Sequence, residues 1–393
     1  MIPAAVERRA RWVLDSVGAT ELGFGDDLPY HAAAWEQVDR GECPTDDDLA
    51  AGFFHLARVE ERNGPRDEHG RFRAEWSRLD PLDPPLERLR RKLGLEQKGF
   101  TVALTHDVDT PWRWTSVGIR GAAARVKRNL LQARFAPAVR ETTALAVAPV
   151  HRLRGTDPNW RFEEIVAEER RRGAHGSTFF VLAAHHDPHD GAAPASYDEL
   201  RPRLVETILG TGAELGLHGS YTAADDPARL AQEKETLERL AGPIEGHRYH
   251  YLRGDPHRNI ANLDFRYDTT LGFPDAVGFR AGIARPFRPW DFERDAPLDL
   301  VEIPLAAMDA TLAEERYLGL SAKRAEPQLM RLLDWGAAHG AAFAILWHPD
   351  RFDPLTSAGW DRLYSRLLEG VQDRGGIAVP GAELVSSHST WSK

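Results

Sequence analysis

Cysteine is almost absent from this chain of 393 residues, since Cys43 is the only one. One thiol cannot form a disulfide within the chain, and it cannot build a metal site from several cysteines. Long apolar runs are missing too, and the first residues, Met1–Arg9, lack the apolar core of a signal peptide. We therefore expect no transmembrane segment and a cytoplasmic location, either free in the cytoplasm or at the inner face of the membrane.

Positive charge is in deficit, because 50 Lys and Arg residues stand against 60 Asp and Glu residues, for a formal net charge of -10. An acidic chain is a poor general binder of nucleic acid, so we expect no nucleic-acid partner. One segment departs from this composition: between Pro111 and Arg154 there are nine Lys or Arg residues and a single acid, Glu141. Two interpretations stay open, a solvated helix surface or a surface for an anion such as a phosphate-linked sugar or an anionic membrane.

A glycine-rich phosphate loop is also missing, which argues against a nucleotide-binding domain. From Gly99 onward, strand patterns alternate with helix patterns, as expected for a parallel sheet with crossover helices. Seven strand candidates over this length favour a closed or nearly closed α/β barrel over an open doubly wound sheet. The candidates are Phe100–Thr105, Ser177–Leu182, Glu214–His218, Ile244–Tyr251, Val277–Arg280, Leu300–Leu305 and Phe343–His348.

Residues 1–97 form a separate compositional unit, in which we see helix patterns but no evident chemistry. We expect a smaller N-terminal domain at 1–97, α-rich or α+β, followed by the barrel at 98–393. In the barrel, helix patterns cover Trp160–Arg172, Tyr197–Thr211, Pro227–Ala241 and Pro327–His339. Asp225 and Asp226 read as the cap of the helix that begins at Pro227.

The most informative residues follow the first strand candidate, where Asp107 and Asp109 stand two positions apart. Side chains alternate along a strand, so both carboxylates project the same way at its end. Two more strand candidates end in a histidine, His218 and His348. Because the carboxyl ends of parallel strands meet at one end of a barrel, these groups predict a hydrolytic site of the zinc type there.

With these residues in hand, the region from about 98 to 393 resembles the NodB-homology polysaccharide deacetylases, which are carbohydrate esterases of family 4. Five segments carry the resemblance, in the order of the family motifs: Thr105–Asp109, Ser177–Val181, Gly212–Ser220, Arg248–Tyr251 and Ile345–Pro349. The resemblance implies a metal-dependent amidohydrolase on a distorted (β/α)7 barrel. The N-terminal part resembles an accessory domain found ahead of some bacterial members.

The resemblance also implies roles for individual residues. It makes Asp109 and His218 metal ligands, Asp107 the general base and His348 the general acid. Arg248 would pair with Asp107 and hold it ionised. The backbone N–H near Tyr251 would bind the substrate by stabilising the oxyanion.

One departure from the family concerns the second metal-binding histidine, because Thr222 occupies its position after His218. A hydroxyl is a poor zinc ligand beside an imidazole, so three outcomes stay open: another residue supplies the third ligand, two ligands and water suffice, or the site is dead. His250, which stands in the place of the motif's proline, is our first candidate for the third ligand. The alternative interpretation of His250 is a core histidine bonded to a backbone carbonyl. The cluster His185–His189 comes second.

Three further candidates rest on position alone. Asp309 follows the strand candidate Leu300–Leu305 and would raise the pKa of His348. Arg280 would contact the substrate, with a buried ion pair as the alternative. Trp112 would stack on a sugar ring, with core packing as the alternative.

The sequence therefore predicts a hydrolase that removes an N-acetyl group from an amino sugar, in a polysaccharide or in a nucleotide- or lipid-linked precursor. Its cofactor would be a divalent metal, with zinc as the first expectation. Its partner would be a carbohydrate substrate, including a phosphate-linked one. The alternatives are a hydrolase of another C–N bond, and a non-catalytic carbohydrate-binding or scaffolding protein on a decayed barrel.

Overall fold

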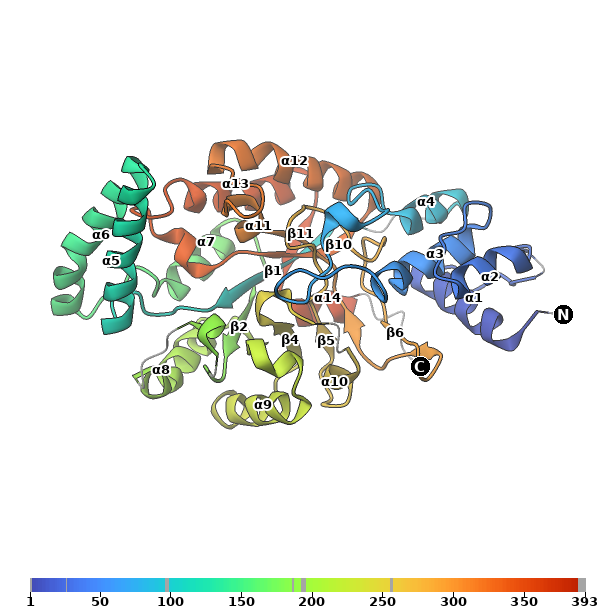
Figure 1. The fold of residues 1–393 in the computed structure, drawn as a ribbon, viewed down its shortest axis with the longest axis horizontal. Coiled ribbons are helices and arrows are strands. Elements are labelled where there is room, and N and C mark those ends of the chain that lie inside the picture. Colours follow the sequence, from blue (N-terminus) through green and yellow to red (C-terminus); the bar gives the residue numbers. More distant parts are fainter. Residues whose placement is uncertain are drawn as a thin grey trace.

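The computed structural model describes residues 2–25, 27–95, 99–185, 187–191, 196–254 and 257–387, with the backbone alone at 196–199. Figure 1 shows a central sheet surrounded by helices, with helical extensions at both ends of the long axis. The expected boundary at 97/98 lies outside the described residues.

The central sheet consists of parallel strands, as predicted. Hydrogen-bonded neighbours follow the order β8-β5-β4-β3-β2-β1-β10-β9, and β11 pairs with β1. All of these pairings are parallel. The strands are β1 (Thr101–Val108), β2 (Thr178–Leu182), β3 (Glu214–Gly219), β4 (Gly246–Tyr249), β5 (Tyr267–Asp268), β8 (Val301–Glu302), β9 (Leu305–Met308), β10 (Ala342–Leu346) and β11 (Ile377–Val379).

The two ends of this strand order belong to one segment of the chain. Only Ile303 and Pro304 separate β8 from β9, and β8 pairs with β5 while β9 pairs with β10. The segment Val301–Met308 therefore joins both edges of the sheet, which curls into the predicted distorted (β/α)7 barrel. A single strand was predicted at Leu300–Leu305; it is divided because Pro304 has no N–H to donate to a ladder.

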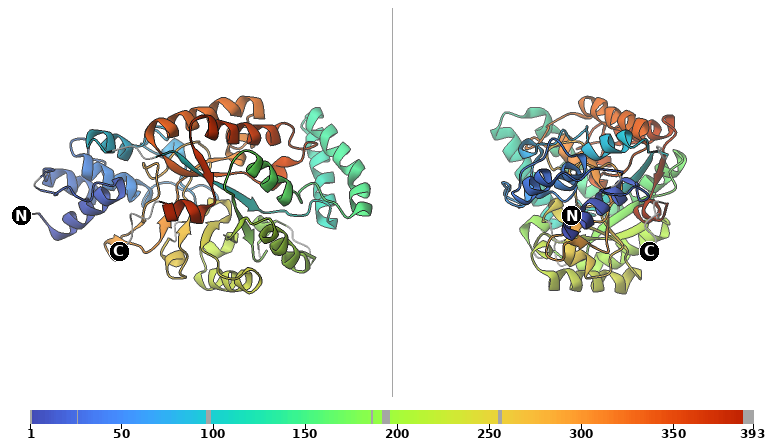
Figure 2. Two further views of the ribbon diagram at one scale, coloured as in Figure 1. Left: turned by 180° about the vertical axis from the view of Figure 1, so that it is seen from behind. Right: turned by 90° about the vertical axis from the view of Figure 1, so that its right-hand side faces the viewer.

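Helices cover the outside of the barrel (Figures 1 and 2). They are α7 (Phe162–Arg171), α8 (Ser196–Gly210), α9 (Pro227–Ala241), α10 (His257–Ala261), α11 (Asp309–Ala313), α12 (Ala322–His339), α13 (Trp360–Asp373) and α14 (Gly381–Ser387). The predicted cap of α9 is confirmed, because the Asp226 side chain accepts from the N–H groups of Ala228 and Arg229. The helix predicted at Pro327–His339 begins five residues earlier.

The strand predicted at Val277–Arg280 was wrong. Gly278 has a φ of 134°, which favours glycine, and a Cβ there would lie 2.3 Å from the carbonyl oxygen of Pro81. The N–H of Phe279 donates to the same Pro81 oxygen over 2.8 Å. This segment forms no strand and packs between the linker at Pro81 and β9, where the N–H of Gly278 donates to the carbonyl of Ala306 over 2.8 Å.

The N-terminal part is helical: α1 (Ala4–Val17), α2 (Ala32–Asp39), α3 (Asp48–Leu56) and α4 (Pro85–Lys92). Its apolar core includes barrel-side residues between 271 and 290, among them Ile283 and Trp290. A two-stranded antiparallel ribbon of β6 (Trp290–Asp291) and β7 (Ala296–Pro297) lies in the same region. A shared core of this kind means that the helices pack against the barrel over a buried apolar interface.

A buried ion pair connects the same two parts. The Arg280 guanidinium donates from Nε and Nη2 to the two carboxylate oxygens of Glu61, over 2.8 and 2.6 Å. Both side chains are at most 3% exposed. Glu61 ends a short 3-10 helix, η1 (Val59–Glu61), which follows α3.

At the opposite end of the molecule, α5 (Ser116–Leu131) and α6 (Phe135–Arg154) form a helical hairpin. Figure 1 shows it projecting beyond the barrel, far from α1–α3. Its small internal core consists of Trp114, Ala122, Ala144 and Ala148. No helix in the described part of the chain combines the length and the apolar character needed to cross a membrane.

The Glu61–Arg280 pair gives a stability prediction. Arg280→Met leaves a buried carboxylate with one partner fewer, so the free energy of unfolding should fall by about 3 kcal/mol. The matched control is Arg239→Met on α9, whose pair with Glu235 is more than 60% exposed on both sides; it should cost less than about 1 kcal/mol. Urea unfolding followed by tryptophan fluorescence measures both, and equal losses would contradict the role of burial.

Candidate metal centre

The end of β1 presents its two carboxylates on one side, as the alternation of side chains requires. Asp107 and Asp109 face the cavity at the mouth of the barrel. His106, between them, points the other way: its Nε2 lies 2.8 Å from the Glu169 carboxylate and its Nδ1 lies 2.7 Å from the Trp347 carbonyl oxygen. The predicted orientation of the pair is confirmed.

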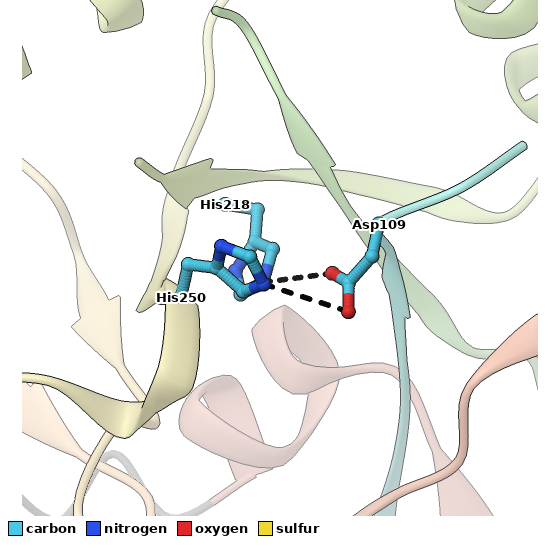
Figure 3. Close-up of side chains that lie close together, drawn as sticks. All are labelled: Asp109, His218 and His250. Atoms are coloured by element: carbon cyan, nitrogen blue, oxygen red, sulfur yellow. Dashed lines mark ion pairs between the residues drawn. The ribbon is translucent and has the colours of Figure 1, made fainter. Parts of the chain in front are cut away.

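Two histidines from neighbouring strands converge on Asp109 (Figure 3). His218, on β3, places Nε2 3.3 Å from Asp109 Oδ1, and His250, directly after β4, places Nε2 3.6 Å from Asp109 Oδ2. The ligand atoms of the three side chains lie within 4.8 Å of one another. The structure thus brings together the three residues that we predicted as metal ligands.

Each histidine is oriented by its other ring nitrogen. Nδ1 of His218 lies 2.9 Å from the carbonyl oxygen of Arg248, and Nδ1 of His250 lies 3.0 Å from the carboxylate of Asp190. An N–H at Nδ1 donates in both cases, which fixes each ring with Nε2 facing Asp109. The Nε2 atom of His218 is buried and makes no hydrogen bond with the described residues.

This arrangement fits a divalent cation. A buried imidazole nitrogen without a hydrogen bond costs free energy unless a proton or a metal occupies its lone pair. Two imidazoles and one carboxylate, with Asp109 31% exposed toward solvent, match a catalytic zinc set that leaves a position open. Burial alone would raise the pKa of Asp109, but the attraction of His250 and the close Nε2 atoms of both histidines hold it well below its ordinary value.

Charge in the centre is strongly coupled. Burial lowers the pKa of His250, yet the carboxylates of Asp109 and Asp190 outweigh burial and raise it to about 9. Asp190 is itself held below its ordinary pKa, because His250 and backbone N–H groups outweigh its burial. The cluster therefore already concentrates negative charge around a point where a cation can replace protons.

Asp107 lies beside this cluster and is bound to a buried cation. Arg248 Nη1 donates to Asp107 Oδ1 over 2.8 Å, and the second oxygen of Asp107 lies 3.5 Å from His218 Nε2. Arg248 is fully buried, with Nη2 donating to the Thr105 hydroxyl and Nε to the Thr269 carbonyl. The predicted Arg248–Asp107 pair is present.

His348 faces Asp109 from the end of β10. Its Nε2 lies 3.6 Å from Asp109 Oδ2, and its Nδ1 lies 2.6 Å from Asp309 Oδ1. Arg351 donates to the other oxygen of Asp309 over 2.9 Å. Burial lowers the pKa of His348, but the carboxylates of Asp309 and Asp109 raise it to about 10. The predicted contact between Asp309 and His348 is therefore present.

A cavity of about 230 Å³ opens over these groups. Its wall includes Tyr251, Tyr317, Glu314 and Arg316 in addition to the residues above. Tyr251 has a φ of 62°, in the left-handed region that a tyrosine rarely adopts. Its carbonyl accepts from Arg71 Nη1 over 3.1 Å, which helps to hold the strained turn in place.

Arg71 is a cavity residue that sequence reasoning missed. It belongs to the turn-rich segment of the N-terminal part, where no chemistry was evident. The Asp67 carboxylate binds its guanidinium, and its Nη2 donates to the Tyr317 hydroxyl over 2.8 Å. Asp190 was also missed; its position directly after the histidine cluster that follows the second strand was the available signal.

Three predicted or considered residues lie elsewhere. Arg280 is in the buried pair with Glu61 and does not line the cavity, which corresponds to the alternative stated for it. Trp112 stacks on Trp160, 4.6 Å between ring centroids, also away from the cavity. The hydroxyl of Thr222 accepts from Arg229 over 2.9 Å and is not part of the ligand cluster.

The histidine cluster that we ranked second is only partly described, since His186 lies outside the described residues. His189 lines the cavity and stacks on Tyr221, with 4.1 Å between ring centroids. Its Nδ1 lies 2.6 Å from the carboxylate of Asp187. It is therefore a wall residue and not a member of the ligand cluster.

A second group of metal-capable side chains occurs within the described residues: His257, Asp268 and Glu302. His257 Nε2 lies 3.1 Å from Glu302, and Asp268 is bound by His247 Nδ1 over 2.8 Å. Burial and the neighbouring Asp268 raise the pKa of Glu302 to about 8. The adjoining cavity measures only about 10 Å³, so this group is a closed hydrogen-bond network.

The sequence matches no family model and no curated relative. Among solved structures, a Mycobacterium smegmatis protein named as a polysaccharide deacetylase aligns with a TM-score of 0.46 and 18% identity, over 75% of this chain and 92% of that one. An allantoinase, PuuE, aligns with a TM-score of 0.47 and 13% identity over 74% and 92%. A CE4 family pseudoenzyme from Bacillus anthracis aligns at 0.37 and 10%, over 74% and 66%. These values describe a likeness of fold, so the chemistry of the site follows from this chain's own residues.

Proposed function

We propose that this protein is a metal-dependent hydrolase that removes an N-acetyl group from an amino sugar. The observation that carries the proposal is the cluster of Asp109, His218 and His250, of which Asp109 and His250 line the cavity. The base candidate and the acid candidate, Asp107 and His348, line the same cavity. The motif resemblance of these residues supports the acetylated amino sugar as the substrate class.

Asp109, His218 and His250 would hold the metal, for which zinc is our proposal. When bound, a divalent cation supplies Lewis acidity for an amide carbonyl and lowers the pKa of water. Asp190 keeps the His250 ring in the orientation that turns Nε2 toward Asp109.

Asp107 would accept the proton of the attacking water. Its hydrogen bond to the buried Arg248 stabilises the carboxylate form, and its free oxygen points toward the cluster. Asp107 can thus accept a proton while Asp109 serves as a metal ligand, because a different cation neutralises each carboxylate.

His348 would donate a proton to the departing nitrogen. An amine is a poor leaving group unless it is protonated, and the Asp309 carboxylate favours the charged imidazolium that can supply this proton. The N–H at Nδ1 is held by Asp309, so the transferable proton is the one at Nε2, on the cavity side.

The first prediction concerns metal content. The purified protein should hold about one divalent ion per chain, and Asp109→Ala or His218→Ala should lose the ion and the activity together. The control is His175→Ala, an exposed histidine 53% accessible and outside the cavity, which should keep both. Elemental analysis after dialysis measures the content, and full occupancy in the two ligand variants would refute the assignment.

The second prediction separates base from acid. Asp107→Asn keeps the size of the side chain but removes the proton acceptor, so turnover should fall by about 10²–10⁴-fold with metal retained. His348→Ala should lose less on 4-nitroacetanilide than on an acetylated amino sugar, because a weakly basic amine leaves without full protonation. Rates for the two substrates, measured alongside metal content, test this; near-normal turnover of Asp107→Asn contradicts the mechanism.

The third prediction concerns Asp190 as the residue that orients His250. Asp190→Ala should weaken metal binding by roughly 10–100-fold, whereas Asp190→Asn, which still accepts from Nδ1, should recover part of the loss. Competition with a chromogenic chelator gives the dissociation constants. If both variants bind metal as the wild type does, the orienting role of Asp190 is wrong.

A further inference from the structure

The α5–α6 hairpin carries most of the exposed large apolar side chains in the described part of the chain. Six of the ten lie on it: Leu130, Leu131, Phe135, Val139, Val150 and Leu153. Leu131 is 79% exposed and Leu153 is 88% exposed, values that are unusual for leucine. Single exposed apolar residues need no explanation, but a cluster on one element marks an interaction surface.

On α6 these side chains form one stripe. Phe135, Val139, Val150 and Leu153 fall within an arc of about 60° at 3.6 residues per turn. Of the buried residues of the helix, Ala144 and Ala148 lie on the other side, whereas Ala138 lies about 60° from the edge of this arc. The stripe therefore faces away from Ala144 and Ala148, and over the about three turns between Val139 and Val150 only Ala146 continues it.

The turn of the hairpin continues this apolar surface. Leu130 and Leu131 end α5, and Phe135 begins α6, so the apolar residues wrap over the end of the hairpin. This end of the hairpin exposes each of the three side chains by more than half. It suits a fluid apolar phase that can close around it.

Positive charge flanks the apolar surface. Arg120, Lys127 and Arg128 are exposed on α5. The single acid of the hairpin, Glu141, is already bound by Arg113 and Arg125. The exposed charge is therefore positive, although the chain as a whole has a net charge of -10. An anionic surface would attract the hairpin and repel the remainder of the molecule.

The hairpin adjoins the mouth of the cavity. Thr110, which lines the cavity, leads into α5, and Arg134 in the turn forms an ion pair with Glu315. Glu315 stands between two cavity-lining residues, Glu314 and Arg316. A surface that receives the end of the hairpin would consequently lie beside the opening of the cavity.

We propose that the α5–α6 hairpin docks the protein on an anionic lipid bilayer, with the apolar end and stripe entering the headgroup region and the basic residues contacting lipid phosphates. Of the two interpretations of the basic segment, this one explains the exposed apolar residues together with the charge. With the proposed function as its basis, docking also points to an acetylated sugar carried on a lipid, presented to the cavity at the membrane surface.

The test is flotation of the full-length protein with vesicles. The protein should float with phosphatidylcholine vesicles that contain about 30% phosphatidylglycerol, and much less with phosphatidylcholine alone. Two triple variants, Leu131→Ser/Phe135→Ser/Leu153→Ser and Arg120→Glu/Lys127→Glu/Arg128→Glu, should each reduce the bound fraction by about tenfold or more. All six positions are exposed, so circular dichroism should show unchanged folding.

Matched controls lie on other helices. Leu240→Ser on α9 removes a leucine that is 40% exposed, and Arg324→Glu/Arg331→Glu on α12 reverses two exposed charges. Both should bind vesicles as the wild type does. Equal loss in variants and controls, or no binding of the wild type to anionic vesicles, would overturn the proposal.

A second copy of the chain is the competing occupant of the stripe. Light scattering of the wild type and the serine variant decides between the two. If the stripe were buried between copies, the wild type would have the mass of a dimer, the serine variant would have the mass of a monomer, and the wild type would not bind vesicles. Flotation is also run with Asp107→Asn. The variant should bind vesicles, because docking does not use the base candidate. If vesicles are bound but the wild type shows no deacetylase activity, the proposed function is refuted and docking still stands.

Discussion

The buried guanidinium of Arg248 is the contact on which the rest of the site depends. The guanidinium binds Asp107 on β1, the Thr105 hydroxyl and the Thr269 carbonyl. The backbone carbonyl oxygen of Arg248 accepts a hydrogen bond from the His218 ring. One residue on β4 thereby sets the direction of the base candidate and of one ligand candidate. A fully buried cation is tolerated here because each of its three nitrogens donates to at least one acceptor. Its removal would disturb both groups at once.

Sequence reasoning located much of the barrel and the centre because both follow local rules. Strand alternation put Asp107 and Asp109 on one side, and parallel strands brought His218 and His348 to the same end. His250 was identified as a candidate ligand from its position in a motif. Asp190 and Arg71 could not be reached in this way, because a loop after β2 and a turn before residue 98 approach the cavity only through tertiary packing.

The errors in the fold have the same origin. Val277–Arg280 has the apolar composition of a strand, yet the linker at Pro81 takes its hydrogen bond. The split of Val301–Met308 depends on Pro304, whose effect on pairing appears only when the neighbours on both sides are known. Local pattern predicts what a segment can form, whereas the partner that it meets decides what it does form.

The segment Val301–Met308 has a further consequence. It joins the two edges of the sheet, and the residue directly after it is Asp309, the partner of His348. A chain in which β9 has not paired with β10 therefore lacks the anion that favours the charged form of His348. Under the proposed function, competence for hydrolysis would require β9 and β10 to be paired, although neither strand carries a ligand candidate of the metal.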